Sequence, residues 1–280
     1  MEIIDKAKRF NNLHTANDAF IMANAWSAGS AVLLEEAGIE AIGTTSAGIA
    51  FSQALPDYKG ELSFDTALNE TNRIVRAVSV PVSMDAENGY GHSSESVFEN
   101  MKKIALTGVV GASIEDYTGD SDNPLYDIEL ATERIQSAKE AVTDLGYPFT
   151  LTARAECYLT GHPDSFNESV RRVNQYHEAG ADCLFVPGIK DIETIKALVG
   201  EVNGPVSVVM GLSGSPISVA ELKEVGVARI SIGGSLARAT FGLVRRAARE
   251  IVDKGTFEFS SQQIANDELC KLFSRHNVKK

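Results

Sequence analysis

The chain has 280 residues, of which 44% are hydrophobic and 23% are charged, a composition that suits a globular protein with one large core. Its formal net charge of −12 argues against a nucleic-acid groove and against an anionic membrane surface, because both attract Lys and Arg. The three cysteines have no CxxC spacing, so neither a disulfide framework nor a zinc site is indicated. No stretch reaches the roughly 20 apolar residues of a membrane span. We therefore expect a cytoplasmic protein without nucleic-acid or membrane partners.

Eight short β-branched runs alternate with helical patterns along the chain. Strands are predicted over residues 20–26, 41–46, 80–87, 111–116, 149–156, 182–187, 205–210 and 229–232. Helices are predicted to end at residue 38, to cover residues 65–78, 93–107, 129–145, 166–179, 192–199 and 236–251, and to include a short one before the last strand. Parallel strands need crossover helices, and eight such units close into a (β/α)₈ TIM-type barrel. An open, doubly wound sheet is the alternative, but no GxGxxG follows the first strand.

Residues 1–254 are predicted to form this α/β barrel as the catalytic domain, and residues 255–280 are predicted to form a C-terminal helical extension. The apolar residues of the extension that share one helical face are Ile264, Ala265, Leu269, Leu272 and Phe273. The ring of eight units is complete without the extension. We expect its apolar face to pack on another subunit or, as the alternative, to close the base of its own barrel.

Two long loops interrupt the regular alternation, over residues 47–64 after the second strand and over residues 117–128 after the fourth. Long loops in compact domains are often binding loops or lids. Both follow strand ends, which is where (β/α)₈ barrels place their chemistry. The second loop is rich in turn-forming residues, a composition that suits a hinged lid as well as a plain solvated connection.

The clearest local signal is the run Ser-Met-Asp-Ala-Glu-Asn-Gly-Tyr-Gly over residues 83–91. Asp85 and Glu87 lie two residues apart, so a regular strand points both carboxylates to the same side. Two such carboxylates repel each other unless a cation or a proton lies between them. Oxygen ligands with few protein donors suit Mg²⁺, with Mn²⁺ as the second choice, better than zinc or copper. The alternative is that these acids cap loops or helix starts.

The fourth and fifth predicted strands end in further charged residues. Glu115 is placed to join the water shell of the metal, whereas Asp116 points the other way in a regular strand. Arg154 and Glu156 share a face of the fifth strand, and Arg154 is a candidate clamp for a carboxylate or a phosphonate. A structural role for the acids and a rim salt bridge for Arg154 are the alternatives.

Five segments at matching strand ends carry a resemblance to a known family. They are Thr45-Ser46-Ala47-Gly48, Pro56-Asp57, residues 85–91, Ser113-Ile114-Glu115-Asp116 and Thr152-Ala153-Arg154. Together, from about residue 9 to residue 251, they resemble the isocitrate lyase and phosphoenolpyruvate mutase superfamily, in particular a carboxyphosphonoenolpyruvate phosphonomutase-like member. The resemblance implies an α/β barrel, a bound Mg²⁺, and cleavage or formation of a C–C or C–P bond beside a 2-oxo acid or its enolate. It also implies that neighbouring subunits of a homodimer or homotetramer exchange their last helix.

The resemblance implies roles for individual residues as well. Asp85 resembles the direct metal ligand, and the acids that resemble holders of the metal's waters are Asp57, Glu87 and Glu115. The residues that resemble donors to the substrate carboxylate are Ser46, Ala47 and Gly48. Arg154 resembles the arginine that contacts the oxyanion, and Arg154 and Glu115 are accordingly predicted to be catalytic.

Departures from the family pattern narrow the reaction. Residues 117–128 contain neither the cysteine nor the histidine of the Lys-Lys-Cys-Gly-His segment that isocitrate and methylisocitrate lyases share. Tyr117 stands where phosphoenolpyruvate mutases carry a lysine, and residues 186–188 lack a histidine that some mutases place there. Glu87 stands where the family more often has aspartate. These departures argue against isocitrate or methylisocitrate cleavage and against the mutase reaction.

Other titratable residues carry less weight. His92 and His162 are more typical of surface histidines, and Cys157 has no recognisable histidine partner and is expected to be inert. On the predicted lid, Tyr117, Asp120 and Asn123 are candidate acid, base or substrate contacts, because a closing loop can supply groups that the open site lacks, and Asn123 is the first choice among them.

The sequence therefore supports a leading hypothesis and two alternatives. The leading hypothesis is a Mg²⁺-dependent carbon–carbon lyase for a small anionic 2-oxo or 2-hydroxy acid, which acts by oxaloacetate-like decarboxylation or cleavage through an enolate. The first alternative is C–P bond chemistry on phosphonopyruvate, by a mutase or a hydrolase reaction. The second alternative is a barrel that binds a 2-oxo acid without turnover.

Overall fold

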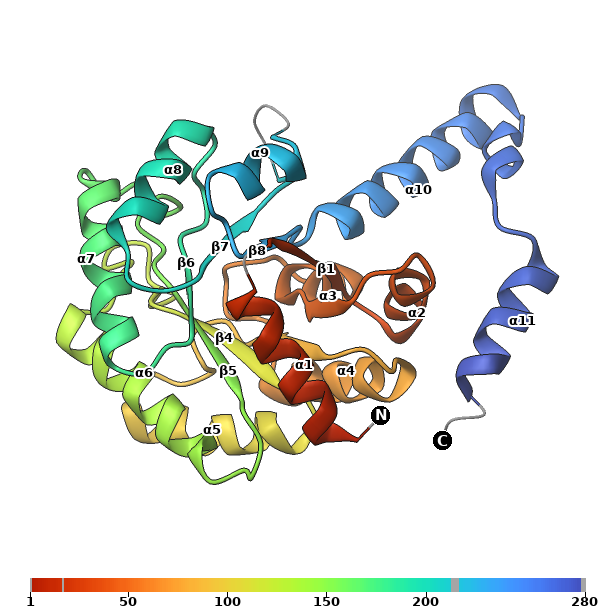
Figure 1. The fold of residues 1–280 in the computed structure, drawn as a ribbon. Helices are drawn as coiled ribbons and strands as arrows, with labels where there is room; N and C mark the ends of the chain where they lie inside the picture. The colour runs from red at the N-terminus through yellow and green to blue at the C-terminus, as the bar shows by residue number, and fades with distance from the viewer. Residues whose placement is uncertain (1, 17, 213–216, 278–280) are drawn as a thin grey trace.

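Eight parallel strands form a closed barrel in the computed structural model, which describes residues 2–16, 18–212 and 217–277. The strands pair in chain order, and the last strand pairs with the first (Figure 1). They are β1 (Phe20–Ala25), β2 (Ala41–Thr44), β3 (Val82–Asp85), β4 (Gly111–Glu115), β5 (Thr150–Arg154), β6 (Cys183–Phe185), β7 (Val206–Val209) and β8 (Arg229–Ser231). Each lies within its predicted range, so the predicted (β/α)₈ TIM-type barrel is confirmed.

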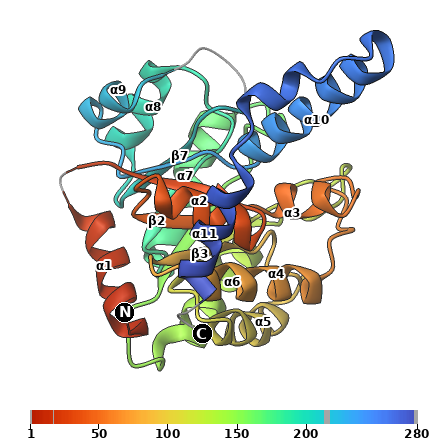
Figure 2. The same ribbon diagram turned by 90° about the vertical axis from the view of Figure 1, so that its right-hand side faces the viewer.

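Apart from the last one, the predicted helices pack around the outside of the barrel (Figures 1 and 2). They are α2 (Ala28–Glu36), α4 (Phe64–Ala77), α5 (Ser94–Leu106), α6 (Ile128–Thr143), α7 (Ser165–Glu178), α8 (Ile192–Glu201), α9 (Val219–Glu224) and α10 (Ser235–Lys254). Side chains at the N-caps set where three of them begin, since Ser63, Ser93 and Asp191 each accept a backbone hydrogen bond from the third helical residue. Among the described residues, no helix is long and apolar enough to cross a membrane.

A helix that is not predicted from the sequence, α1 (Ile3–Thr15), closes the N-terminal end of the barrel. Its buried face carries Ala7, Phe10 and His14. Phe10 packs edge to face on Phe20 of β1, with ring centroids 6.1 Å apart. The base of the barrel is therefore covered by α1, and the alternative that the C-terminal extension covers it is wrong.

The C-terminal segment leaves the barrel and returns to it. The helix α10 projects outward, and η1 (Glu258–Gln262) and α11 (Asn266–Asn277) lead the chain back (Figure 1). The returning helix reaches the side of the barrel beside α2, where His276 Nδ1 lies 3.0 Å from the carbonyl oxygen of Ala77. Within α10, all of which the structure describes, Ala237 alone is buried. Most of the apolar face of α10 is therefore uncovered in the single chain.

The two long loops are more regular than the sequence predicts. The first contains a short helix, α3 (Ser46–Ser52), which corrects the expectation of a continuous loop over residues 47–64. Thr45 caps this helix, because its side chain accepts a hydrogen bond from the Gly48 N–H. The second loop folds back on itself through an antiparallel bridge between Tyr117 and Leu125. Both loops follow the C-terminal ends of strands and so border the same end of the barrel.

Candidate active site

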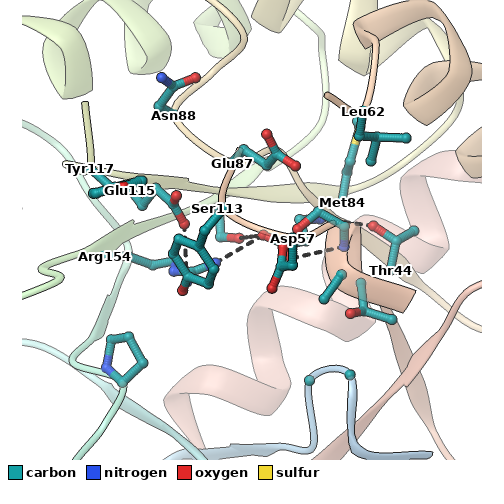
Figure 3. Close-up of a pocket in the computed structure, with 18 of the residues that line it drawn as sticks. Thr44, Asp57, Leu62, Met84, Glu87, Asn88, Ser113, Glu115, Tyr117 and Arg154 are labelled. Carbon is teal, nitrogen blue, oxygen red and sulfur yellow. Dashed lines mark hydrogen bonds and ion pairs between the residues drawn. The ribbon is translucent and has the colours of Figure 1, made fainter. Parts of the chain in front are cut away.

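A pocket of about 940 Å³ opens at the C-terminal ends of the strands. The predicted site residues that line it are Ser46, Ala47, Asp57, Asp85, Glu87, Glu115, Tyr117 and Arg154 (Figure 3). Closure of the barrel brings these residues together from the ends of β2 to β5 and from the two long loops. The structure thus assembles most of the predicted site in one cavity of a size typical for small-molecule binding.

Arg154, the last residue of β5, is the centre of an ion-pair network (Figure 3). Its Nη1 lies 3.0 Å from Asp85 Oδ1, and its Nη2 lies 3.0 Å from Glu115 Oε2 and 2.9 Å from Glu156 Oε1. Burial alone lowers the pKa of Arg154, but the charges of Glu156, Glu115 and Asp85 raise it well above its ordinary value. The guanidinium is therefore a permanent cation held among three carboxylates.

Asp85 is bonded on both of its carboxylate oxygens. Its Oδ1 contacts Arg154, and its Oδ2 accepts hydrogen bonds from the Ser46 N–H at 3.1 Å and from the Ser46 hydroxyl at 3.0 Å. The Asp85 N–H donates to the Thr44 hydroxyl at 2.9 Å, which fixes the end of β3 against β2. The predicted metal ligand and a predicted substrate donor are therefore in direct contact.

Glu87 and Asp57 add two more carboxylates to the same cavity. Burial, followed by the charges of Asp85 and Asp57, raises the pKa of Glu87 to about 7. Burial and the charge of Asp85 raise the pKa of Asp57 as well. Mutual repulsion of this kind is relieved by a cation, and the donors are all oxygens, which suits Mg²⁺.

The donor set fits a metal that keeps most of its waters. In the described parts of the chain, no three Asp, Glu, His or Cys side chains are arranged as direct ligands. Mg²⁺ commonly binds through one or two carboxylates and retains water in its other positions. Asp85 as the direct ligand, with the neighbouring acids acting through water, is compatible with this arrangement.

A buried arginine that sequence reasoning missed, Arg134 of α6, holds the turn after β3. Its guanidinium donates to the backbone carbonyls of Asn88, Gly91 and His92, at 2.6 Å for Gly91 and 2.5 Å for His92. The turn needs this support, because Glu87 has a φ of 46°, in the left-handed region that non-glycine residues rarely adopt. Arg134 thus positions the segment that carries the acids. Nothing in the sequence distinguishes it from a surface arginine of an amphipathic helix.

Asp116 faces away from the pocket, as a regular strand predicts. Its Oδ2 lies 3.0 Å from Arg172 Nη1 and accepts a hydrogen bond from the Tyr176 hydroxyl at 2.7 Å. Its Oδ1 accepts a hydrogen bond from the Glu156 N–H at 2.9 Å. Asp116 therefore joins β4 and β5 to α7 and has no place in the pocket.

The two long loops meet above the acids. The rings of Tyr58 and Tyr117 pack edge to face with centroids 5.5 Å apart, and both residues line the pocket. The Tyr58 hydroxyl lies 3.4 Å from Glu156 Oε2, which connects the first loop to the charged network. The predicted lid position of Tyr117 is therefore consistent with a contact to bound substrate.

Two predicted site residues are not in the pocket. Asn123 is exposed at the tip of its loop, where its carbonyl oxygen accepts a hydrogen bond from the Thr118 hydroxyl at 2.6 Å. The Gly48 N–H donates to the Thr45 hydroxyl at 3.2 Å, so it serves the cap of α3. A side chain at Gly48 would come within 2.9 Å of Trp26 Cβ, which shows that close packing requires this glycine. The structure does not bring either residue into the pocket.

The remaining candidates are placed as follows. Cys157 is buried, and burial raises the pKa of its thiol to about 11, which agrees with an inert role. His92 is exposed at the rim of the pocket, with Nδ1 2.6 Å from the Tyr126 hydroxyl. His162 accepts a hydrogen bond from the Asp164 N–H and does not line the pocket.

Comparison with known proteins places these residues in a family context. The family model described as phosphoenolpyruvate phosphomutase matches residues 10–252. An uncharacterized protein of Mycobacterium tuberculosis (strain CDC 1551 / Oshkosh) is 30% identical over 87% of this chain and 89% of its own length. The 2-methylisocitrate lyase of Escherichia coli (strain K12) is 27% identical over 74% and 70%. Oxaloacetate decarboxylase 1 of Pseudomonas putida (strain W619) is 26% identical over 84% and 82%.

Two solved structures are similar over nearly the whole chain. One is from Burkholderia cenocepacia J2315 and is described as a lyase/mutase without a fixed reaction; it has a TM-score of 0.93 and 44% identity, and covers 97% of this chain and 96% of its own. The other is phosphonopyruvate hydrolase in complex with oxalate and Mg²⁺, with a TM-score of 0.87 and 25% identity over 98% and 96%. The similar proteins thus include enzymes named for C–C chemistry and for C–P chemistry.

Proposed function

Because the chain belongs to the phosphoenolpyruvate phosphomutase family, we propose that it is a Mg²⁺-dependent lyase that cleaves a C–C bond beside a 2-oxo or 2-hydroxy acid. The observation that carries this proposal is the contact of Arg154 with three carboxylates at the strand ends, two of which, Asp85 and Glu115, line the pocket. Such a cluster offers a cation for a substrate carboxylate and acids for a metal. A small dicarboxylate such as oxaloacetate is the leading substrate, and the similarity to an oxaloacetate decarboxylase supports this choice.

Substrate binding follows from the donors around Asp85. Arg154 is suited to orient a carboxylate, because its planar guanidinium can donate two parallel hydrogen bonds. Ser46 adds an N–H and a hydroxyl, both of which donate to Asp85 in the structure. A substrate carboxylate that takes over these donors would release Asp85 to bind a cation. Substrate and metal binding are therefore expected to favour each other.

The metal would be held by the oxygen donors already described. Asp85 is the proposed direct ligand, with Asp57, Glu87 and Glu115 holding the metal's waters. When bound, Mg²⁺ supplies positive charge beside the 2-oxo oxygen and so stabilises the enolate that forms as the adjacent bond breaks. Mn²⁺ has the same preference for oxygen ligands and is the alternative ion.

Decarboxylation of oxaloacetate requires that the bond from C3 to its carboxylate breaks, that CO₂ leaves, and that the electron pair passes to the 2-oxo oxygen. C3 then takes up a proton. Glu115 lines the pocket, and burial raises its pKa well above the ordinary value although the charge of Arg154 opposes this, so Glu115 is a candidate proton source. Tyr117 of the closing loop is the second candidate, because it lines the mouth of the same pocket.

Phosphonopyruvate is the second candidate substrate. Lys59 of the first long loop lines the pocket and can balance the extra charge of a phosphonate. The second long loop has Tyr117 instead of a lysine directly after Asp116, so Lys59 of the first long loop would supply the missing cation. The 25% identity to a phosphonopyruvate hydrolase supports the same alternative.

Proton and phosphorus NMR test these reactions directly. The purified protein is incubated with oxaloacetate, 2-alkylmalates or phosphonopyruvate, with Mg²⁺ or with a chelator, against enzyme-free controls for spontaneous decay. We expect Mg²⁺-dependent formation of pyruvate from oxaloacetate. Turnover of phosphonopyruvate but of no carbon acid would select the second candidate. Mg²⁺-dependent binding of oxaloacetate without any product would favour a binding barrel.

We further propose that the protein is a homodimer or homotetramer in which the C-terminal helices pack on a second copy. The exposed apolar residues of α10 are Leu236, Phe241, Leu243, Val244, Ile251 and Val252. Exposed apolar areas of this kind commonly mark protein interfaces. Light scattering after size exclusion tests the proposal: Val244→Glu should shift the protein to smaller species, whereas the neighbouring Arg245→Glu should not. An unchanged mass for Val244→Glu would contradict it.

A further inference from the structure

A second arginine, Arg229 at the start of β8, lies deep inside the barrel. Its exposed fraction is 2%, and it lines the same pocket as Arg154. Its Nε donates to Ser207 Oγ at 2.9 Å, and its Nη1 contacts Thr152 Oγ1 at 3.0 Å and His14 Nε2 at 3.2 Å. Within the described ranges of the chain, no carboxylate lies at ion-pair distance from it.

The groups nearest Arg229 are neutral. The Nδ1 of His14 lies 2.8 Å from the Phe10 carbonyl oxygen and must donate to it, so Nε2 accepts from Arg229. Burial and the charge of Arg229 lower the pKa of His14 to about 3. Burial raises the pKa of the Cys183 thiol, which keeps it protonated. The positive charge of Arg229 is therefore not balanced by the groups that touch it.

Arg229 lines the same pocket as Asp85 and Arg154 at its mouth. The small residues on the inner face of the barrel that line the pocket are Gly43, Ser83, Ser113 and Ser231. This position in a TIM barrel is usually filled by bulky branched side chains. Thr152, which contacts Arg229, precedes Arg154 by two residues on the same strand, so it lies roughly 7 Å deeper along the barrel. Because Arg229 contacts Thr152 at this depth and also lines the pocket, the pocket continues one layer below the acid cluster.

We propose that Arg229, held in place by the hydroxyls of Ser207 and Thr152, forms a second, deeper anion subsite, which binds a carboxylate or another small monovalent anion. Burying a charge without a partner costs free energy, and an anion bound in the pocket beside Arg229 would supply the missing partner. Ser207, Thr152 and His14 accept from Nε and Nη1 of Arg229, which leaves its Nη2 to donate to the anion. The subsite goes beyond the lyase function and does not depend on it.

Anomalous diffraction tests the subsite in the wild-type chain. Crystals of the metal-free protein are soaked in sodium bromide, and data are collected at the bromine absorption edge. We expect an anomalous peak at hydrogen-bond distance from the Arg229 guanidinium. Bromide peaks at the surface alone, or none at all, would overturn the proposal. This measurement needs no substitution, so it remains decisive if a variant at Arg229 does not fold.

Thermal unfolding provides the matched comparison in solution. The melting temperature is measured against bromide at constant ionic strength, with sodium gluconate as the larger balancing anion. We expect bromide to raise the melting temperature of the wild type and the rise to be lost in Arg229→Met. The control is Arg238→Met, which removes an exposed arginine at the rim of the same pocket and should keep the rise. Loss of the rise in Arg238→Met but not in Arg229→Met would contradict the proposal.

Formate separates the two sources of the anion. If the subsite takes a carboxylate of the substrate, formate should raise KM in proportion to its concentration without lowering kcat, and Arg229→Met should abolish this inhibition. If the subsite takes a free anion, formate should shift the melting temperature through Arg229 and leave KM unchanged. No effect of formate on either quantity would overturn the carboxylate specificity. Because the diffraction and unfolding measurements need no turnover, they stand even if the proposed lyase activity fails.

Discussion

Two arginines on the inner face of one barrel, Arg154 at the mouth and Arg229 one layer below, differ in what surrounds them. Both are nearly buried, with exposed fractions of 8% and 2%. Arg154 contacts three carboxylates, whereas Arg229 contacts two hydroxyls and an imidazole. Burial therefore does not determine the role of a cation in this barrel. The charge of the neighbouring groups determines it. An arginine that contacts carboxylates forms ion pairs within the protein, whereas one with neutral neighbours can pair with a bound anion.

The largest expected effect comes from Arg154→Met. It leaves the carboxylates of Asp85, Glu115 and Glu156 buried without their cation, and removing one partner of such a network costs about 3–5 kcal/mol of unfolding free energy. Loss of the oriented donor should lower kcat/KM for oxaloacetate by about 10²–10³. Urea unfolding and steady-state kinetics measure the two effects. Arg154→Lys, which keeps the charge but loses the planar fork, should recover most of the stability and little of the activity. Unchanged kinetics in both variants would contradict the role of Arg154.

The pH dependence of stability should show that His14, which contacts Arg229, is neutral in the folded protein. The unfolded chain protonates His14 near pH 6.5, whereas the folded chain does so only near pH 3. Protons therefore favour the unfolded state between these values, and the His14 contribution to the free energy of unfolding falls as the pH is lowered from 6.5 toward 3. The slope is at most about 1.4 kcal/mol per pH unit. It should appear as the difference between wild type and His14→Gln in urea unfolding. A difference that does not vary with pH would contradict this account.

Arg229→Met should have a much smaller effect on stability than Arg154→Met. It removes a buried cation that no carboxylate balances, and replacing buried charge with an apolar side chain of similar size is often neutral or stabilising. We expect the free energy of unfolding to change by no more than about 1 kcal/mol in buffer without bromide or formate. Urea unfolding of the two Met variants side by side checks this. A loss for Arg229→Met as large as that for Arg154→Met would remove the contrast between the two sites.

The smallest expected effect is that of Tyr117→Ala on the loop above the mouth. Its ring packs on Tyr58, so the substitution should loosen the contact between the loops rather than remove a charge. We expect a rise in KM of about 3- to 10-fold, because a group worth 1.4 kcal/mol changes an equilibrium tenfold. Tyr58→Ala should give a similar rise if the two loops close together. A fall in kcat as large as that for Arg154→Met would instead assign Tyr117 a direct catalytic role.

Regular periodicity made the barrel predictable from the sequence. Runs such as Val206–Val209 are β-branched and short, and the helices between them carry clear caps such as Ser63 and Ser93. The N-terminal helix was missed, because residues 3–15 mix charges and apolar side chains without a clear boundary, and its packing against β1 is set by the tertiary fold. Strand spacing predicts the inward direction of Asp85, which ends β3, whereas Glu87 lies in the turn after β3 with a φ of 46° and is positioned by that turn.

Residues whose role depends on long-range contacts could not be predicted in the same way. Arg134 and Arg229 look like ordinary charged residues until the fold buries them against carbonyls or hydroxyls. The sequence predicts that the loop with Asn123 closes over the pocket. In the structure, Asn123 is exposed in the loop that the bridge between Tyr117 and Leu125 folds back. Gly48 belongs to the segment that resembles the substrate donors, but close packing and the cap of α3 explain why a glycine is present there. Contacts of this kind are decided by the tertiary structure and not by local spacing.

In the proposed function, the acid-rich mouth of the pocket binds a divalent cation through Asp85 together with a 2-oxo-acid carboxylate. Electron paramagnetic resonance of Mn²⁺, titrated into the metal-free protein with and without oxalate, tests it most directly. We expect equimolar Mn²⁺ binding that oxalate strengthens and that Asp85→Asn abolishes. The control is Asp120→Asn, which removes an exposed acid of the second long loop at the same pocket and should leave Mn²⁺ binding intact. Equal Mn²⁺ affinity in the wild type and Asp85→Asn would contradict it.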